Sequence, residues 1–440
     1  GIGTCLEGFS LVDVATGRET PVALPPNACP DWPLWSPDGR RFAFVNTTDA
    51  GVELWLGKVE DGSIRRVDGV RINPILENEL QWLGARDALL VKTVPENAGP
   101  APQKAAVPPG PEIKDATEGG GESSTYEARD TLSSPEDETL FDYYASAQLA
   151  VVDARSGAVQ RVGEPAVLGE VRAAPDGRHV LVDVLTRPYS YVVTWQRFAH
   201  EVTVLDLDAG TSRTLATLPA AESVPVRGVP TGPRGFEWRA NAPATLVYAE
   251  ALDGGDWKNT VPERDRVLMW AAPFTGKPVE IARTAQRYAG QYWFERGSKA
   301  LLVQYDANRR WLTISLMDVD KPRSAARVLW DLSMDERYAH PGNPQSRTLA
   351  NGASVLREQD GAIFLAGSGA SPQGDRPFLD RYDLGSGKTE RLFRSAPDAY
   401  ERLLGFAPEP GGLLTWHESP IDPPNAFRRR LGAALADAAA

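Results

Sequence analysis

A short turn-and-strand pattern recurs along the chain and constrains its fold more than any other feature. The sequence Trp-Ser-Pro-Asp-Gly-Arg-Arg-Phe-Ala-Phe at 35–44 joins a tight turn to a strand. Pro37 fixes the φ angle of the turn, Asp38 can accept hydrogen bonds from the neighbouring backbone, and Gly39 tolerates a positive φ. The pattern returns closely at 174–182, and more loosely at 241–248 and 296–303.

A second repeated pattern is a hairpin whose first strand often ends at an aspartate and whose turn contains glycine. It occurs at 9–22, 54–67, 149–162, 202–215, 267–281 and 379–392. Between these outer hairpins lie inner strand pairs, at 80–83 with 88–91, 236–238 with 245–248, 292–294 with 300–303, and 403–406 with 412–416. One inner pair and one outer hairpin make a four-stranded unit. This unit repeats every roughly 40 to 60 residues, which is the period of propeller blades.

This repeat predicts an all-β fold: a β-propeller of about seven, or eight, four-stranded blades with the last blade incomplete. The 440 residues exceed the size at which one hydrophobic core stops growing, and repetition of small sheets solves that problem. Helical periodicity is almost absent. Two β-sandwiches are the alternative, but they fit a four-strand period less well.

Composition excludes several classes of partner. The net charge of −12 argues against a nucleic-acid ligand. The sequence contains no run of 18 apolar residues, which is about the length that a membrane-spanning helix needs. Cys5 and Cys29 could pair in an oxidising compartment, but we expect two unpaired thiols. No signal peptide is visible, yet the chain opens without Met and a leader could have been lost, so cytoplasm and periplasm both remain open.

Two segments interrupt the repeat. The stretch at about 95–139 is rich in Pro, Gly, Ser and acidic residues, so we expect a disordered insertion on a rim, anchored by Phe141, Tyr143 and Tyr144. The connection at 186–198 carries more arginine and aromatic residues than a turn needs. Its guanidinium groups suit carboxylate ligands, although packing with arginine ion pairs is the alternative.

Catalytic signatures are missing from the sequence. The hydrolase pentapeptide G-x-S-x-G does not occur, and 367–371, the nearest stretch, lacks the last glycine. The histidines are scattered, and His417 beside Glu418 is interpreted as structural. Phosphate-binding, dinucleotide-binding and zinc motifs are also missing. We therefore predict no catalytic residues, no metal ligands and no cofactor in these residues.

Several longer runs resemble the propeller of the prolyl oligopeptidase family, and within it the glutamyl endopeptidase-like branch of bacteria and chloroplasts. The runs lie at 35–44, 90–95, 142–149, 187–191, 242–246, 250–256, 364–371, 418–420 and 423–425. The resemblance implies a serine peptidase in which a propeller caps an α/β-hydrolase domain that holds Ser, Asp and His. We therefore expect a propeller over 1–427, a non-propeller tail over 428–440, and the hydrolase domain to be absent from this chain.

The resemblance also implies a function. The propeller would gate the entry of peptide substrates and work with a catalytic α/β-hydrolase domain, in cis or in trans. Family members that prefer an acidic residue need a cation near the substrate, and the candidate substrate-binding residues are Arg187, Tyr189, Tyr191 and Arg197. The alternative is a stand-alone propeller that binds a protein or peptide partner without catalysis.

Overall fold

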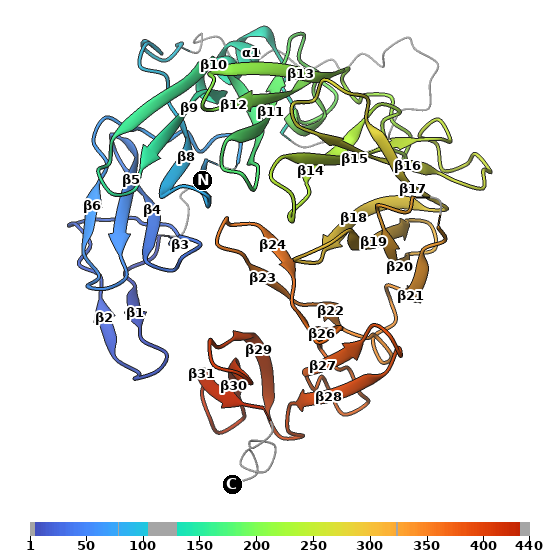
Figure 1. The fold of residues 1–440 in the computed structure, drawn as a ribbon. Coiled ribbons are helices and arrows are strands. Elements are labelled where there is room, and N and C mark those ends of the chain that lie inside the picture. The colour runs from blue at the N-terminus through green and yellow to red at the C-terminus, as the bar shows by residue number, and fades with distance from the viewer. Residues whose placement is uncertain (1–4, 78, 104–129, 323, 432–440) are drawn as a thin grey trace. The chain divides into compact units, whose positions relative to one another are not determined.

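The computed structural model describes residues 5–77, 79–103, 130–322 and 324–431. They divide into two compact units, which are treated separately. The first comprises residues up to 262 with 268–279 and 350–353, and the second comprises 263–267, 280–349 and the residues from 354 onward. Almost all of the regular structure is β-strand (Figure 1).

In the first unit, antiparallel strands follow one another in chain order. A small sheet pairs β1 (Ser10–Val12) with β2 (Glu19–Pro21). A four-stranded sheet has the order β3 (Leu34–Trp35), β4 (Arg41–Thr48), β5 (Gly51–Lys58) and β6 (Ile64–Arg66). A seven-stranded sheet runs from β7 (Leu80–Leu83) through β8 (Ala88–Thr93), β9 (Ser146–Asp153), β10 (Val159–Ala173), β11 (His179–Leu185) and β12 (His200–Asp206) to β13 (Thr211–Leu218).

Strand β10 is the reason for the seven-stranded sheet. Its first half pairs with β9, from Val159 opposite Val152 to Val167 opposite Ser146, and its second half pairs with β11. The register shifts between Val162 and Ala166 on one side and between Leu168 and Val171 on the other. One long, bent strand therefore serves as the outermost strand of one four-stranded set and the innermost strand of the next.

The remaining sheets repeat the same order. One contains β14 (Arg234–Trp238), β15 (Thr245–Ala251), β16 (Asp265–Ala271) and β17 (Val279–Thr284). In the second unit, the next contains β18 (Arg287–Trp293), β19 (Lys299–Asp306), β20 (Trp311–Asp318) and β21 (Arg327–Ser333). Then come β22 (Asn343–Pro344), β25 (Glu358–Gln359), β26 (Ala362–Gly367), β27 (Phe378–Asp383) and β28 (Thr389–Arg394), with a side hairpin of β23 (Ser346–Thr348) and β24 (Ser354–Leu356). The last has three strands, β29 (Tyr400–Phe406), β30 (Gly412–Glu418) and β31 (Asn425–Arg430).

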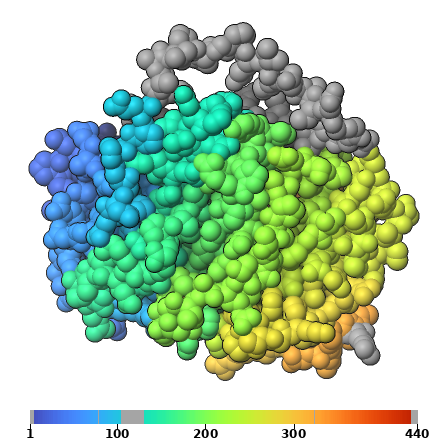
Figure 2. Space-filling model, turned by 90° about the horizontal axis from the view of Figure 1, so that it is seen from above, coloured from blue at the N-terminus to red at the C-terminus, as the bar shows by residue number. Residues whose placement is uncertain are grey.

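Within each unit, successive sets of strands are held together by apolar side chains. In the first unit, Leu54 and Leu56 of β5 pack with Leu89 of β8 and Val152 of β9 in one core cluster. A further cluster joins Leu90 and Leu149 to Val180 and Leu205, and another joins Val204 to Leu246 and Tyr248. Figure 2 shows the teal and green residues, which include the later strands of the seven-stranded sheet, as one continuous surface. Sequential four-stranded antiparallel sheets that each pack on the next define the β-propeller class.

The predicted turns are confirmed, and their aspartates have a clear role. Gly39 has a φ of +69° and the Asp38 carboxylate accepts the Arg40 N–H at 3.0 Å. In the outer hairpins, Asp153 accepts the Ser156 N–H at 2.6 Å and Asp383 accepts the Ser386 N–H at 2.7 Å. Hydrogen bonds from the turn lower the pKa of both carboxyl groups, because they stabilise the ionised form.

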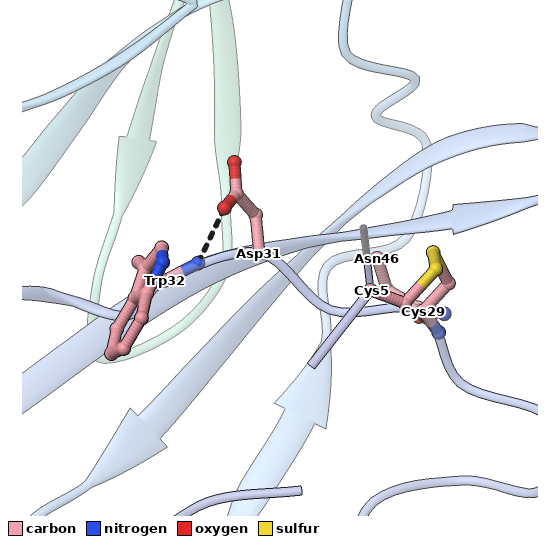
Figure 3. The surroundings of a disulfide bond; sticks show 5 residues. All are labelled: Cys5, Cys29, Asp31, Trp32 and Asn46. Atoms are coloured by element: carbon pink, nitrogen blue, oxygen red, sulfur yellow. Dashed lines mark hydrogen bonds between the residues drawn. A yellow bond between two sulfur atoms is a disulfide. The ribbon is translucent and has the colours of Figure 1, made fainter. Parts of the chain in front are cut away.

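The prediction of two free thiols is wrong, because Cys5 and Cys29 form a disulfide (Figure 3). Backbone pairing explains why they meet. The Leu6 N–H donates to Pro30 O at 3.1 Å, and the Cys29 N–H donates to the Asn46 side chain at 2.8 Å. These bonds place the two Cα atoms 4.7 Å apart, within the range that a disulfide requires.

Two predicted boundaries also need correction. The prediction of disorder over 95–139 is wrong for its last residues, because α1 (Pro135–Ala145) is an α-helix capped by the Ser134 hydroxyl, with proline at its start and acidic residues in its first turn. Residues 104–129 of that insertion lie outside the described residues. The tail predicted to begin at 428 is also wrong for its first residues, because Arg428, Arg429 and Arg430 pair with Leu414, Leu413 and Gly412 as part of β31.

Candidate functional site

The connection between β11 and β12 meets helix α1 in a cluster of charged and phenolic groups. The Arg187 guanidinium donates to the carboxylates of both Asp142 and Glu138, and its Nε lies 3.0 Å from Asp142 Oδ2. The Tyr189 hydroxyl donates to Asp142, and the Tyr191 hydroxyl donates to Glu138 at 2.7 Å. We call Glu138, Asp142, Arg187, Tyr189 and Tyr191 the arginine–tyrosine cluster.

Aromatic packing fixes this cluster in place. Phe141 of α1 meets Tyr189 edge to face at 5.0 Å between ring centroids, and it meets Phe198 in the same way at 5.7 Å. Tyr189 is buried and stacks on Phe198, whereas Tyr191 keeps 43% of its surface exposed. The predicted anchoring by Phe141 is therefore confirmed. Tyr143 adds a hydrogen bond from its hydroxyl to Gly99 O at 2.9 Å.

The charges of the cluster determine what it can bind. Hydrogen bonds and ion pairing with Asp142 and Glu138 raise the pKa of Arg187. Burial and the hydrogen bond to Asp142 raise the pKa of Tyr189, so this phenol stays protonated and remains a donor. Two carboxylates face one guanidinium, so an acidic ligand must displace one of them before it can bind Arg187.

Sequence reasoning located three of the five cluster residues and missed the carboxylates. Glu138 was overlooked because it lies within 95–139, which was interpreted as disordered, and Asp142, just beyond that stretch, was not recognised as a partner of Arg187. The available signal was the order Ser134, Pro135, Glu136, Asp137, which is typical of a helix start. Arg197, the fourth predicted residue, is the half-buried last residue of the short 3-10 helix η1 (Trp195–Arg197), and its carbonyl accepts the Ala221 N–H at 2.8 Å.

A second polar group lies buried within the seven-stranded sheet. Lys92 of β8 is 2% exposed, and its ammonium donates to the carbonyl oxygen of Leu76, with those of Gly169 and Leu168 at 3.3 and 3.5 Å. Burial lowers the pKa of Lys92 to about 8, although Glu79 and Glu77 oppose that shift. Near it, an alanine-like Cβ at Gly169 would lie 3.6 Å from Asp183 Cβ, which places Asp183 of β11 beside this backbone.

Asp183 provides a test of this buried environment. Burial raises the pKa of Asp183 from 3.8 to about 6; His200 and Arg172 oppose the shift and Glu170 adds to it. The folded protein therefore holds this proton more tightly than the unfolded chain, and stability present below pH 4 is lost as the pH rises through 6. We expect Asp183→Asn to raise the free energy of unfolding by about 1–2 kcal/mol at pH 7.5 and to have little effect at pH 4.

Chemical denaturation at the two pH values measures this difference. The matched control is Asp49→Asn, which removes an exposed carboxylate from the β4–β5 turn. Equal effects of Asp183→Asn at pH 4 and pH 7.5 would contradict a raised pKa, because the change would then act through packing alone.

Within the described residues, no group of three or more His, Cys, Asp or Glu side chains is arranged to hold a metal ion. None of the described helices is long and apolar enough to cross a membrane. Ser371, in the stretch nearest to a nucleophile motif, has its hydroxyl bonded to Gly374 O at 2.7 Å inside a tight turn.

Comparison with known proteins narrows the class of protein that this chain resembles more than its fold does. It is 34% identical over 384 residues to a protein named probable glutamyl endopeptidase, chloroplastic, from Oryza sativa subsp. japonica. It is 35% identical over 385 residues to the protein of the same name from Arabidopsis thaliana. Each alignment covers 83% of this chain, but the chain spans only about 40% of the length of these relatives.

The repeated sheets define a β-propeller protein. The sequence identity adds that the chain is similar, over 83% of its length, to the N-terminal part of proteins named probable glutamyl endopeptidase. The chain matches no model of a known protein family.

Solved structures give more distant likenesses. An oligogalacturonate lyase in complex with manganese has a TM-score of 0.47 at 14% identity, with 98% of each chain covered. The β-propeller domain of the Trilobed protease from Pyrococcus furiosus has a TM-score of 0.44 at 9% identity, with 91% of this chain and 95% of that chain covered.

Proposed function

We propose that this chain is the substrate-gating propeller of a glutamyl endopeptidase-like serine peptidase and that it works with a catalytic α/β-hydrolase domain. The observation that carries the proposal is the identity of about one third with two proteins of that name over 83% of this chain. A propeller above a hydrolase site would admit short peptides and exclude folded proteins. The chain's share of its relatives, about 40%, leaves ample length in them for a second domain.

We further propose seven blades, of which the last has three strands. Five sheets in the described residues have four or more strands, and the three-stranded sheet β29–β31 adds another unit. The seventh unit comes from the shared strand β10, because the seven-stranded sheet separates into β7–β10 and β10–β13.

The mass of the native gene product tests the peptidase proposal. These residues account for 47.7 kDa. A product larger by a hydrolase domain, on the order of 200 residues or more, would support it, as would a separate hydrolase that co-purifies with a 47.7 kDa chain. A product of 47.7 kDa that purifies without any hydrolase would instead favour the stand-alone binding propeller.

The arginine–tyrosine cluster is the proposed contact for an acidic substrate residue, with Arg197 as a further cation from the same connection. The Arg187 side chain is half exposed, and it sits 5.1 Å from the Tyr189 ring centroid. In the complete enzyme, we expect Arg187→Ala to lower kcat/KM for a substrate with Glu at the cleaved position about tenfold, and to leave the matching Gln substrate unchanged. The control Arg213→Ala removes an exposed arginine from β13. Equal slowing of both substrates, or no slowing, would count against this role.

A further inference from the structure

A small cavity in the first unit lies where β5 and β6 face the end of β8. Its volume is about 380 Å³, and its walls come from Glu53, the segment Arg66–Arg71, the segment Thr93–Glu96, and Arg161 of β10. Val67 and Pro95 are buried beneath it and give it an apolar floor. This volume is near the lower end for small-molecule sites and suits one or two amino-acid residues.

Three arginines stand around this cavity, and two of them are already neutralised. Arg66 pairs with Glu53 at 3.2 Å and with Asp68 at 3.1 Å. Arg161 pairs with Glu96 and also donates to Gly69 O at 3.4 Å. The Arg71 guanidinium is different, because within the described part of the chain it has no ion pair and no hydrogen bond. It is therefore the cation that an anionic ligand can reach without breaking an existing pair.

The backbone and aliphatic stem of Arg71 are ordered by contacts, even though its guanidinium has no partner among the described residues. Its carbonyl accepts the Val94 N–H at 2.8 Å, and the next residue, Ile72, donates to Val52 O at 2.8 Å. Its aliphatic stem lies over Gly51, where a Cβ would come within 3.0 Å of Arg71 Cδ. Gly51 has a φ of +134°, a value that also excludes most other residues. Because the backbone and the aliphatic part of Arg71 are already ordered, less conformational entropy is lost when the guanidinium binds a ligand.

We propose that this cavity binds the carboxylate of a short peptide and that Arg71 is the group that pairs with it. The apolar floor takes the side chain next to the carboxylate, and the ligand carboxylate accepts two N–H bonds from the fork of Arg71. The carboxylate can be a free C-terminus or the side chain of an acidic residue, since both present the same planar acceptor. This site does not depend on the peptidase proposal, because it requires no catalytic domain.

Calorimetric titration of the full 440-residue chain at low salt tests the site. The probes are acetyl-Ala-Val as the free acid, the same dipeptide as its amide, and acetyl-Glu-amide. We expect the free acid, the glutamate probe or both to bind, and the dipeptide amide to bind at least about tenfold more weakly than the stronger acid. The stronger acid probe identifies the source of the carboxylate. Absence of binding by both acids at millimolar concentration would overturn the proposal.

Three variants locate the binding. Arg71→Gln is expected to weaken binding of the acid probe about tenfold. The melting temperature of this variant should equal that of the wild type, because the Arg71 side chain is exposed. Gly51→Ala is expected to weaken binding by displacing the Arg71 stem. Arg18→Gln removes an exposed arginine in the β1–β2 hairpin and should bind like the wild type. Wild-type affinity in Arg71→Gln, or an equal loss in Arg18→Gln, would refute the assignment.

Discussion

Replacing Arg429 with methionine is expected to lower the free energy of unfolding of the second unit by about 3 kcal/mol, because it leaves a buried carboxylate without its counter-ion. Glu401 of β29 is 4% exposed, and Arg429 of β31 reaches it with Nε at 2.9 Å and with a second nitrogen at 3.3 Å. The fully buried Thr415 of β30 donates its hydroxyl to the same carboxylate. One carboxylate thus connects all three strands of this sheet.

Denaturant unfolding with a double-mutant cycle measures the effect. We expect the double variant Glu401→Leu with Arg429→Met to lose about 1–2 kcal/mol less stability than the sum of the losses of its two single variants, because each single change leaves one group without its counter-ion. The control Arg430→Met alters the exposed neighbour on β31 and should stay within about 0.5 kcal/mol of the wild type. Equal stabilities of Arg429→Met and Arg430→Met would mean that the ion pair of Arg429 with Glu401 contributes nothing measurable to stability.

The same strand shows how far sequence reasoning reaches. Hairpins such as 149–162 and 379–392 are visible because their turns carry an aspartate and a positive-φ glycine, which are local signals. Strand β31 has no such signal: Arg428–Arg430 look like a charged tail until Arg429 is seen to meet Glu401, which lies 28 residues earlier. Pairing between residues that are distant in sequence decides this element, and a local pattern cannot contain it.

The sequence analysis also missed the hairpin β20–β21 and found only part of the candidate site. The turn after Asp318 contains no glycine, so the hairpin lacked its usual marker. Arginine and tyrosine stood out in 186–198 because they are unusual in a connection, but their partners Glu138 and Asp142 lie 49 and 45 residues from Arg187. Composition can identify a residue with a special role, whereas its partner and its net charge depend on the fold.

Truncating Lys92 is the second change expected to have a large effect. Lys92→Ala removes a buried four-carbon stem and leaves the carbonyl groups of Leu76, Leu168 and Gly169 without their donor. Loss of packing and of these hydrogen bonds outweighs the relief of no longer burying a charge, so we expect the free energy of unfolding to fall by about 3 kcal/mol at pH 7. Urea denaturation of the first unit measures it, and unchanged stability would show that the ammonium is not bound as described.

Lys92→Met keeps the stem but carries no charge, so its pH profile isolates the titration of the lysine. The pKa of Lys92 is about 8 in the folded protein and 10.5 ordinarily, so between these values the unfolded chain binds more protons and stability rises with pH. The free energy of unfolding of the wild type should therefore rise by about 3 kcal/mol relative to that of Lys92→Met across that pH window, and most of the rise should be complete by pH 10. The control Lys299→Met, at an exposed position of β19, should produce no such slope relative to the wild type. A falling difference between pH 8 and pH 10 would mean that the carbonyl cage stabilises the ammonium more than burial penalises it, and that the pKa of Lys92 is raised.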